Sequence, residues 1–541
     1  MGFVLFVLAI SVGVTVVSVC SQLRYNKGLR TKIHLSFGHI PDNEDIDFNS
    51  ISSYADCMEK DDLRIDQITW RDLDMDSVYK RINTCQSFVG DEYMYNVLHE
   101  LKIEQDVLLR RESMMRFFDD NPESRFDVQY ALARLGKDGN NGIATMMFNA
   151  NRKLLRWASA YNILAIMPLI FIATMFINQV VGVVGFCLIF AVNLAVHYMS
   201  IKALDNEMTT IDHFSSMVKC CARLYKIEAL SKLPVMVELK EPYKVFKNSI
   251  SKSPHRGLSS GNGFLWTYIN IAFLFDVRSY NKFMALITQH NQEFQSVYKA
   301  IGEIDVAISV LSFRKSVPAY CTPIFHSDST LDFEEVYHPL IQAPISNSHR
   351  ISTDCLITGS NASGKSTFIK SLAVNGILAQ TIYTCTAKKF ATRLTMIVTS
   401  MAMRDNLLGG ESYFIVEIKS LKRVMNLVAK HPCICYFDEI LRGTNTPERI
   451  AASTAILKHL NKQDCLCIVA SHDIELAHLL NYDNYHFSER ITDSDIVFDY
   501  TLKQGPSTTR NAIKLLELLG FEAEVVAHAS ELIVSRNTIT G

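Results

Sequence analysis

A turn rich in small residues constrains this 541-residue chain more than any other stretch. Residues 359–367 have the spacing G-x-x-x-x-G-K-[ST], with an apolar run before them and an apolar, helix-forming stretch, residues 368–378, after them. In such a turn, glycines let backbone N–H groups surround phosphate oxygens, a lysine reaches the terminal phosphates, and a hydroxyl binds Mg²⁺ at the positive end of the helix. The sequence therefore predicts a nucleotide ligand. The residues expected to hold it are Gly359, Ser360, Asn361, Ala362, Ser363, Gly364, Lys365, Ser366 and Thr367.

Two later apolar runs each end in residues suited to phosphate chemistry. One run ends in Asp438 and Glu439, and the other ends in His472. A carboxylate at the end of a buried strand can hold Mg²⁺, and a second carboxylate can orient or deprotonate an attacking water. The carboxyl ends of neighbouring parallel strands lie on the ligand side of such a sheet, which places the histidine near the γ-phosphate. We therefore expect Ser366 and Asp438 to bind the metal, and Glu439 and His472 to be catalytic.

An uncharged stretch at the N-terminus predicts a first membrane segment. Residues 3–23 carry no charge and match the length of one bilayer-spanning helix. Basic residues follow directly within residues 24–32, and basic flanks stay cytoplasmic. A cleaved signal peptide would need a basic region before the apolar run, and none is present. We therefore expect residues 1–23 to be an uncleaved transmembrane anchor.

A second uncharged stretch lies between Arg156 and Lys202 and is about twice the length of one span. It breaks near Asn178 and Gln179, which predicts a transmembrane hairpin over residues 156–202. Basic residues flank both sides, so both ends are expected in the cytoplasm. The alternative is a buried hairpin of a soluble fold. The expected location is a membrane crossed several times, with the nucleotide-binding domain in the cytoplasm.

The rest of the N-terminal half is predicted to be mainly helical. Residues 24–64 are expected to be a linker, because much of this segment is acidic and polar. Apolar residues recur at helical spacing in residues 65–155, the expected helical core, and in residues 203–325, the expected helical lever or connector. Within the lever, residues 280–316 are predicted to form one long helix. Residues 264–275 are apolar but too short for a span, which favours a core helix.

Composition limits the choice of partners and cellular setting. Hydrophobic residues make up 48% of the chain, and the formal net charge of −2 provides no global basic field. Any nucleic-acid contact must therefore use a local positive surface. The 13 cysteines include no C-x-x-C pair and no zinc-type spacing with histidine, so a reducing, intracellular setting is expected for the nucleotide-binding domain.

Several motifs occur in a fixed order in the C-terminal part of the chain. They are the 359–367 loop with its Asn361, Met403-Arg-Asp405, the stretch from Glu411-Ser412 to Glu417, the stretch from Asp438-Glu439 to Thr446, Ser471-His472, and Gly505-Pro-Ser-Thr-Thr-Arg510. This order and spacing resemble those of the MutS family of ATPases. Similarity is weaker upstream, in residues 80–155 and in residues 280–325 with Asp305.

The resemblance implies an α/β P-loop NTPase domain of the ABC/MutS type over residues 326–541. It implies that an all-α core and lever region, here with transmembrane helices, precedes this domain. ATP and Mg²⁺ are the implied cofactors, with His338 on the adenine side. The resemblance also implies a homodimer formed through the ATPase domains, in which Ser412 reaches the γ-phosphate bound by the partner chain. DNA binding of the mismatch-repair type is implied as well.

Departures from the family pattern leave more than one function open. The N-terminal mismatch-reading domain has no counterpart, and the predicted transmembrane hairpin stands where a DNA clamp is expected between the lever helices. One candidate function is a membrane-anchored, DNA-directed ATPase of the mismatch-repair type. The other is a membrane ATPase that couples its nucleotide state to a membrane or protein partner without recognising mismatches. A transporter is a weaker third candidate, because no charge inside the predicted spans marks a substrate path.

Overall fold

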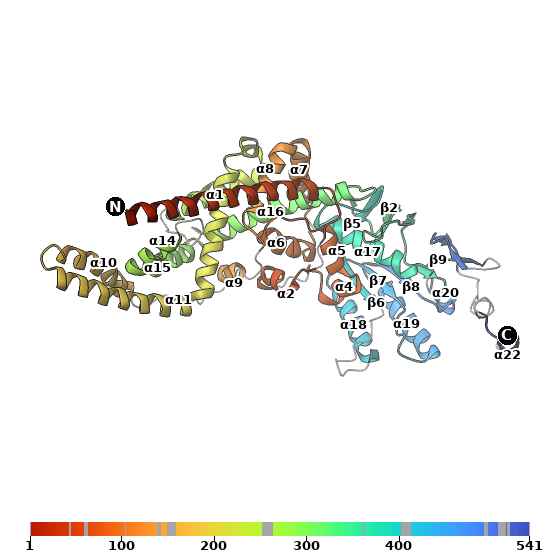
Figure 1. Ribbon diagram of the computed structural model, residues 1–541. Helices are drawn as coiled ribbons and strands as arrows, with labels where there is room; N and C mark the ends of the chain where they lie inside the picture. Colours follow the sequence, from red (N-terminus) through yellow and green to blue (C-terminus); the bar gives the residue numbers. More distant parts are fainter. Residues whose placement is uncertain are drawn as a thin grey trace. The chain divides into compact units, whose positions relative to one another are not determined.

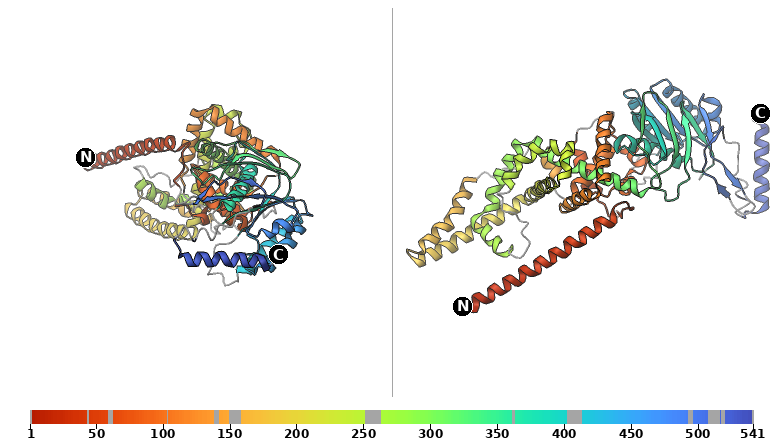
Figure 2. Two further views of the ribbon diagram at one scale, coloured as in Figure 1. Left: turned by 90° about the vertical axis from the view of Figure 1, so that its right-hand side faces the viewer. Right: turned by 90° about the horizontal axis from the view of Figure 1, so that it is seen from above.

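The computed structural model of the chain separates into two compact units (Figures 1 and 2). The helical unit comprises Met1–Glu59, Ile82–Asn96 and Glu112–Lys315, and the sheet unit comprises Lys60–Arg81, Val97–Arg111 and Ser316–Gly541. The structure describes residues 2–42, 45–58, 63–102, 104–137, 142–148, 158–250, 263–360, 363–401, 413–491, 496–506, 516 and 520–539.

A six-stranded sheet forms the centre of the sheet unit, with strand order β12-β9-β4-β8-β7-β6. All neighbouring strands run parallel except β12, which pairs antiparallel with β9. The central strands are apolar and buried on both faces, as expected for a parallel sheet covered by helices. The strands are β4 (Cys355–Thr358), β6 (Met396–Met401), β7 (Cys433–Asp438), β8 (Cys465–Ala470), β9 (Asp483–His486) and β12 (Lys503–Gln504).

Helices cover both faces of this sheet. Figure 1 shows α17 (Lys365–Thr381) on one side of the strands, and α18 (Tyr413–Val428) and α19 (Thr446–Leu460) on the other. From β4 to β6 the chain moves along the sheet in one direction, and from β6 through β7 to β8 it moves back in the opposite direction. Because connections between parallel strands are right-handed, helices on these two paths lie on opposite faces of the sheet. The short α20 (Glu475–Leu479) follows β8. The carboxyl ends of β4, β7 and β8 therefore meet at one edge.

A second sheet has the strand order β1-β5-β2-β3. Its first pair is parallel and the others are antiparallel. The strands are β1 (Ile324–His326), β2 (Leu331–Val336), β3 (Asn347–Ile351) and β5 (Lys389–Arg393), and a separate hairpin pairs β10 (Glu489–Ile491) with β11 (Ile496–Phe498). Helix α22 (Ala523–Ile539) lies near the C-terminus. This unit is thus an α/β domain, as the sequence predicted.

Two short segments that the sequence assigned to the helical core belong to the sheet unit instead. Helix α4 (Gln67–Asp72) lies against the edge strand β6, and α5 (Met75–Ile82) follows it. Asp72 accepts hydrogen bonds from the Thr399 hydroxyl at 2.7 Å and from the Met401 amide at 3.1 Å. These contacts cover the exposed edge of the sheet, where unpaired backbone groups would otherwise remain.

The helical unit is built entirely from helices among the residues that the structure describes. Several of its helices continue across the boundary with the sheet unit. They are α1 (Gly2–Ser36), α2 (Phe48–Ile51), α3 (Ser53–Cys57), α6 (Phe88–His99), α7 (Gln105–Asp120), α8 (Pro122–Ala133), α9 (Ile143–Phe148), α10 (Ala158–Thr174), α11 (Gln179–Leu224), η1 (Glu228–Lys232), α12 (Pro234–Glu238), α13 (Lys240–Ile250), α14 (Gly263–Phe273), α15 (Phe275–Gln289) and α16 (Asn291–Ser316).

Two predictions for this unit were wrong. Residues 24–36 continue helix α1, and α2 and α3 follow it, so residues 24–64 are not an extended linker. Tyr54 in α3 is buried and stacks on Tyr298 with ring centroids 4.8 Å apart, which fixes this short helix. Residues 280–316 do not form a single helix, because His290 adopts φ −118° and ψ 47° and ends α15 before α16 begins.

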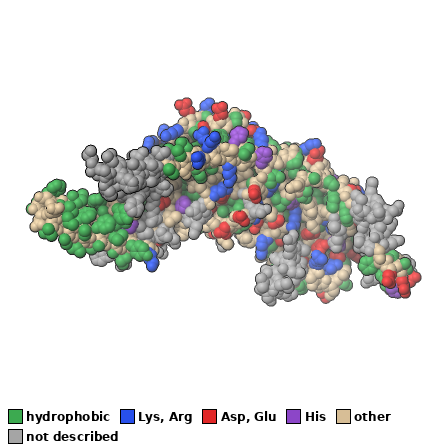
Figure 3. Space-filling model, in the orientation of Figure 1, with side chains coloured by type: hydrophobic (Ala, Val, Ile, Leu, Met, Phe, Trp, Pro, Cys, Tyr) green, Lys and Arg blue, Asp and Glu red, His purple; other side chains and the backbone are tan. Residues whose placement is uncertain are grey.

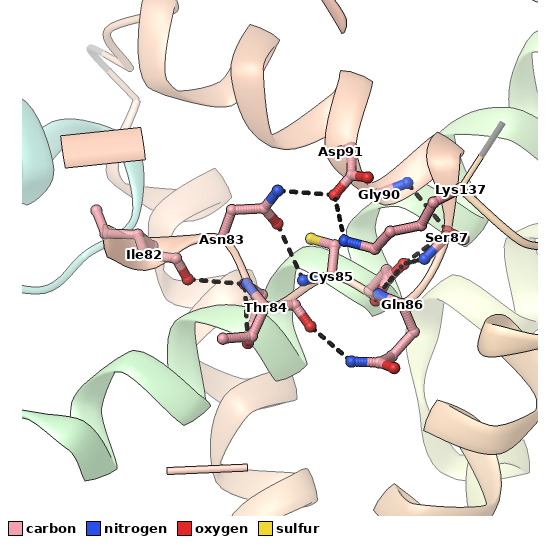
Figure 4. Close-up of polar contacts among 11 residues, drawn as sticks. Ile82, Asn83, Thr84, Cys85, Gln86, Ser87, Gly90, Asp91 and Lys137 are labelled. Carbon is pink, nitrogen blue, oxygen red and sulfur yellow. Dashed lines mark hydrogen bonds and ion pairs between the residues drawn. The ribbon is translucent and has the colours of Figure 1, made fainter. Parts of the chain in front are cut away.

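A polar network joins α16 to the start of α6. Asp305, which is 1% exposed, accepts hydrogen bonds from the backbone amides of Gln86 and Ser87 at 2.9 Å and from the Ser87 hydroxyl at 2.6 Å. Beside these residues, Asp91 pairs with Lys137 at 3.2 Å (Figure 4). Gly90 is required here, because a Cβ atom at this position would lie 2.3 Å from Asp305 Oδ2. The network fixes the start of α6 against the buried helix α16.

Helices α10 and α11 form the hairpin that the sequence predicted over residues 156–202, and Asn178 caps the second helix. Within the described residues, Gln179–Ser200 is the one helix long and apolar enough to cross a membrane, and Ser159–Thr174 is a shorter apolar helix. Hydrophobic side chains gather on the surface over these two helices (Figure 3). The predicted anchor at residues 1–23 lies within α1, and a location that crosses the membrane several times stays a prediction.

Candidate nucleotide site

The phosphate-type loop lies between β4 and α17, as the sequence predicted. Gly359 and Gly364 have φ values of +146° and +103°, a backbone conformation that residues with a side chain rarely adopt. A Cβ atom on Gly359 would lie 2.6 Å from the Phe487 carbonyl oxygen, and one on Gly364 would lie 2.9 Å from the Tyr500 ring. The two glycines therefore let the loop backbone pass close to the Phe487 carbonyl oxygen and the Tyr500 ring. Asn361 and Ala362, at the middle of the loop, lie outside the described residues.

Lys365 begins α17 and is 4% exposed. Its ammonium donates hydrogen bonds to the carbonyl oxygens of Gly359 at 2.8 Å and of Ser360 at 2.7 Å. Burial lowers the pKa of Lys365, and the nearby carboxylates of Asp438 and Glu439 act in the opposite direction. The side chain is thus a cation held against the loop, where the terminal phosphates of a nucleotide are expected.

A cavity of about 480 Å³ lies beside the loop. Two buried oxygen atoms in this region, Ser363 Oγ and Asp438 Oδ1, have no hydrogen-bond partner among the residues that the structure describes. Buried polar atoms normally have partners, so these two atoms fit a site that receives a polar ligand or ion. The polar residues that line the cavity include His338, Ser363, Lys365, Ser366, Glu439 and His472.

Asp438 at the end of β7 lies near Ser366, as the predicted metal site requires. Burial raises the pKa of Asp438, the Ser366 hydroxyl lowers it by hydrogen bonding, and the negative charge of Glu439 raises it further. A divalent cation would offset this excess of negative charge. The described residues contain no group of three or more metal-binding side chains. Mg²⁺ is commonly held by one or two protein groups together with phosphate oxygens and water, so Ser366 and Asp438 are a sufficient number of protein ligands for it.

Glu439 and His472, predicted as catalytic, are in direct contact. The Nε2 atom of His472 lies 2.6 Å from Glu439 Oε1, and its Nδ1 atom lies 2.9 Å from the Gly359 carbonyl oxygen. The Arg442 guanidinium lies 3.2 Å from the other oxygen of the same carboxylate. Hydrogen bonding by His472 is the main cause that holds the pKa of Glu439 below its usual range, and Arg442 acts in the same direction. Glu439 is therefore a carboxylate at neutral pH.

The backbone after β7 is strained. Glu439 and Leu441 have φ values of +56° and +59°, in the left-handed region that disfavours residues with a Cβ atom. Each such residue costs on the order of 1–2 kcal/mol, so surrounding contacts must hold the turn in place. The Glu439 amide donates to the Ala470 carbonyl oxygen at 3.0 Å and so joins the turn to the end of β8.

His338 follows β2 and lines the cavity. The preceding Tyr337 is fixed through its carbonyl oxygen, which accepts hydrogen bonds from Asn375 at 3.1 Å and from the Thr386 hydroxyl at 2.7 Å. The Nδ1 atom of His338 accepts a hydrogen bond from the Leu340 amide at 3.3 Å. Burial lowers the pKa of His338 to about 4. At neutral pH it is therefore an uncharged ring, suited to stacking on a nucleotide base.

The structure brings together most of the predicted site residues from β4, β7, β8 and the end of β2. Ser412, the residue expected to act on the partner chain's nucleotide, lies outside the described residues. Sequence reasoning missed the contacts that hold the site in shape. Arg449 forms a two-pronged ion pair with Asp473 at 2.6 and 2.8 Å, and Ser360 donates to Glu489 at 2.8 Å. No local pattern reveals these pairs, because their members are 24 and 129 residues apart.

Comparisons with known proteins agree with this geometry. Residues 355–536 match the family model described as MutS domain V. The chain is also 27% identical over 274 residues to the DNA mismatch repair protein MutS of Natronomonas pharaonis. This alignment covers 48% of the chain and 32% of that relative, so the chain spans about a third of the relative's length. The loop and the acidic strand end lie within the matched region and the cavity lies beside it, so this part of the chain is similar to MutS domain V.

Proposed function

We propose that this chain is an ATPase that binds ATP with Mg²⁺ in the cavity beside the 359–367 loop and hydrolyses the γ-phosphate. The observation that carries the proposal is the convergence on one cavity of a loop lysine, a strand-end carboxylate and a histidine. These groups are Lys365, Glu439 and His472, and they come from separate segments of the sheet unit. The family match supports the same activity, because MutS-type domain V is an α/β ATPase domain.

Each group has a distinct part in the proposed mechanism. The amides of the loop and the Lys365 ammonium bind the phosphates. Ser366 and Asp438 would hold Mg²⁺, which supplies positive charge against the phosphate oxygens. The Glu439 carboxylate orients the attacking water and accepts its proton, and His472 positions this carboxylate through its hydrogen bond at 2.6 Å. The neutral His338 ring stacks on the adenine.

Two copies of the chain are proposed to associate through their ATPase domains when ATP is bound. A helix N-terminus and hydroxyl from a second copy would complete the anion site that one chain leaves open on one side. Hydrolysis would weaken this bridge and so release the dimer. The family resemblance carries this part of the proposal, and the relevant Ser412 lies outside the described residues.

The proposed activity is tested by ATP binding and turnover with purified protein in detergent and Mg²⁺. Lys365→Ala is expected to abolish ATP binding, because it removes the cation at the phosphates. Glu439→Gln is expected to retain binding but to lose turnover by about 100-fold or more, and to accumulate an ATP-bound dimer. Lys422→Ala, on the exposed surface of α18, is the control and should behave like the wild type. Wild-type turnover in Glu439→Gln would contradict the assigned base.

A second candidate function couples this ATPase to a membrane without mismatch recognition. The observation that favours it is the apolar surface of the α10–α11 hairpin, where Phe176 is 90% exposed, Ile177 is 89% exposed and Val180 is 72% exposed. Exposed apolar surface of this extent is unusual for a soluble protein and fits the hydrocarbon core of a bilayer. We propose a membrane-anchored protein with a cytoplasmic ATPase domain.

The membrane proposal and DNA binding are separable by experiment. Co-flotation with phosphatidylcholine vesicles in the absence of detergent is expected for the wild type and should fall strongly in a Phe176→Glu, Ile177→Glu double variant. Duplex DNA binding at low salt, with an affinity that falls steeply as salt rises, would instead favour the mismatch-repair type of function. The printed name of the relative supports DNA as a partner, but the aligned segment covers only 32% of that protein.

A further inference from the structure

The turn that carries Glu439 is held from outside by one acidic side chain. Glu417, on α18, accepts a hydrogen bond from the Arg442 amide at Oε1 with a distance of 3.1 Å. Its Oε2 atom accepts one from the Gly443 amide at 3.4 Å. Both oxygens of the carboxylate therefore point at consecutive backbone N–H groups. A carboxylate placed against successive amides fixes their direction, because each bond has its own angular preference.

The turn needs such support because its own geometry is unfavourable. Glu439 and Leu441 both have positive φ values, and neither is a glycine. The far end of the turn is fixed separately, since Asn445 caps α19 and accepts from the Glu448 amide at 3.1 Å. Between the strand and this cap, Glu417 is the side chain that holds the amides of residues 442 and 443.

The position of the turn determines what reaches the catalytic carboxylate. The Arg442 amide bonds to Glu417, while the Arg442 guanidinium lies 3.2 Å from Glu439. A shift of the Arg442 backbone would move this guanidinium and relax the strained φ of Glu439. The carboxylate would then lose its guanidinium neighbour and its direction toward the cavity. An error of about 1 Å in such a group can cost about 100-fold in rate.

We infer that Glu417 is a positioning residue for hydrolysis, which holds the 439–443 turn so that Glu439 faces the γ-phosphate. This inference rests on the proposed ATPase function and names a further residue for the same site. Glu417 is not among the described residues that line the cavity, so its loss is expected to affect the chemical step more than the binding of ATP. Burial raises the pKa of Glu417 and the turn amides lower it, which is consistent with a carboxylate whose main partners are these amides.

The experiment compares Glu417→Ala and Glu417→Gln with the wild type and with the control Lys422→Ala on the same helix. In Glu417→Ala, kcat is expected to fall by about tenfold or more while KM changes by less than about threefold. Glu417→Gln keeps one acceptor oxygen and should retain an intermediate rate. Hydrogen exchange of peptides covering residues 439–445 should be faster in Glu417→Ala, and exchange in α17 should be unchanged.

The possible results separate this inference from the proposed function. Full turnover and unchanged exchange of the turn in Glu417→Ala would overturn the positioning role while leaving the ATPase intact. Equal losses in ATP binding and in exchange protection across the whole sheet unit would show that Glu417 only supports folding, and would also overturn it. A wild-type protein that binds ATP but never hydrolyses it would overturn the proposed function and, with it, this role.

Discussion

His472 and Glu439 form the central contact of the candidate site, with His472 Nε2 2.6 Å from Glu439 Oε1. The two residues follow neighbouring parallel strands, β8 and β7, so the sheet itself brings them together. The other ring nitrogen of His472 lies 2.9 Å from the Gly359 carbonyl oxygen, at the start of the phosphate-type loop. One imidazole thus connects the loop to the carboxylate and fixes the orientation of both.

Removal of this imidazole should affect hydrolysis more than binding. We expect His472→Ala to lower kcat by about 10- to 100-fold, because Glu439 loses the hydrogen bond that orients it. ATP affinity should change by less than about threefold, since the amides and the ammonium that bind phosphates are retained. The measurement is single-turnover hydrolysis together with equilibrium binding of a fluorescent ATP analogue. His478→Ala, an exposed histidine on α20, is the control, and an equally large effect there would contradict the specific role of His472.

The buried carboxyl group of Asp305 should make the helical unit less stable as the pH rises. Burial raises the pKa of Asp305 to about 6, although hydrogen bonds from Ser87 and Gln86 act in the opposite direction. Nearby, Asp91 raises this pKa and Lys137 lowers it. A raised pKa means that the folded state binds the proton more tightly than the unfolded state. The stabilisation is therefore complete below about pH 4 and is lost as the pH rises through about 6.

This dependence can be measured by pulse proteolysis in urea at a series of pH values from about 4.5 to about 7, in steps of about half a pH unit. The wild type should lose on the order of 2–3 kcal/mol of stability from this group over that range. Asp305→Asn carries no titrating proton and should show a flatter profile. Parallel profiles for the two proteins would contradict the assignment to Asp305.

The sequence predicted the site better than it predicted the surrounding packing. The loop glycines, Asp438 and His472 were identified correctly as neighbours because chain order and parallel strands determine which residues meet at one edge of a sheet. In contrast, the contact of Asp72 with Thr399 joins residues 327 positions apart, and no local periodicity reports it. The break at His290 was missed for a related reason, because the apolar spacing continues on both sides of it.

The short helices α2 and α3 also depend on a contact between residues far apart in the sequence, which the sequence alone did not reveal. The segment that contains them is acidic and polar, which led to the prediction of a linker. They form because Tyr54 stacks on Tyr298 and because Asp47 accepts a hydrogen bond from the Asn49 amide at 3.1 Å. The capping signal is visible in the sequence, but the aromatic partner lies far along the chain. Tertiary contacts therefore decide the structure of this segment.

The contact between α4 and the edge strand β6 should stabilise the sheet unit locally. Asp72→Ala would leave the Met401 amide and the Thr399 hydroxyl without their carboxylate partner, which costs on the order of 2 kcal/mol. Because the chain has two units, we expect the effect as faster hydrogen exchange in residues 396–401 rather than as a global change. Arg71→Ala, an exposed residue of the same helix, should leave this exchange unchanged. Unaltered protection of β6 in Asp72→Ala would contradict the role of the contact.

The polar side chain of Asn193 should hold the apolar hairpin together. Asn193 is fully buried in α11, and its amide donates to the carbonyl oxygen of Leu164 in α10 at 3.1 Å and of Ala272 in α14 at 2.7 Å. Hydrogen bonds between helices in an apolar environment contribute about 0.6–2 kcal/mol. We therefore expect Asn193→Ala to lower the melting temperature of the detergent-solubilised protein by a few degrees and to speed proteolysis within α14. Val192→Ala, at a neighbouring position that is 47% exposed, is the control. Equal melting of Asn193→Ala and the wild type would show that the three helices are held by apolar packing alone.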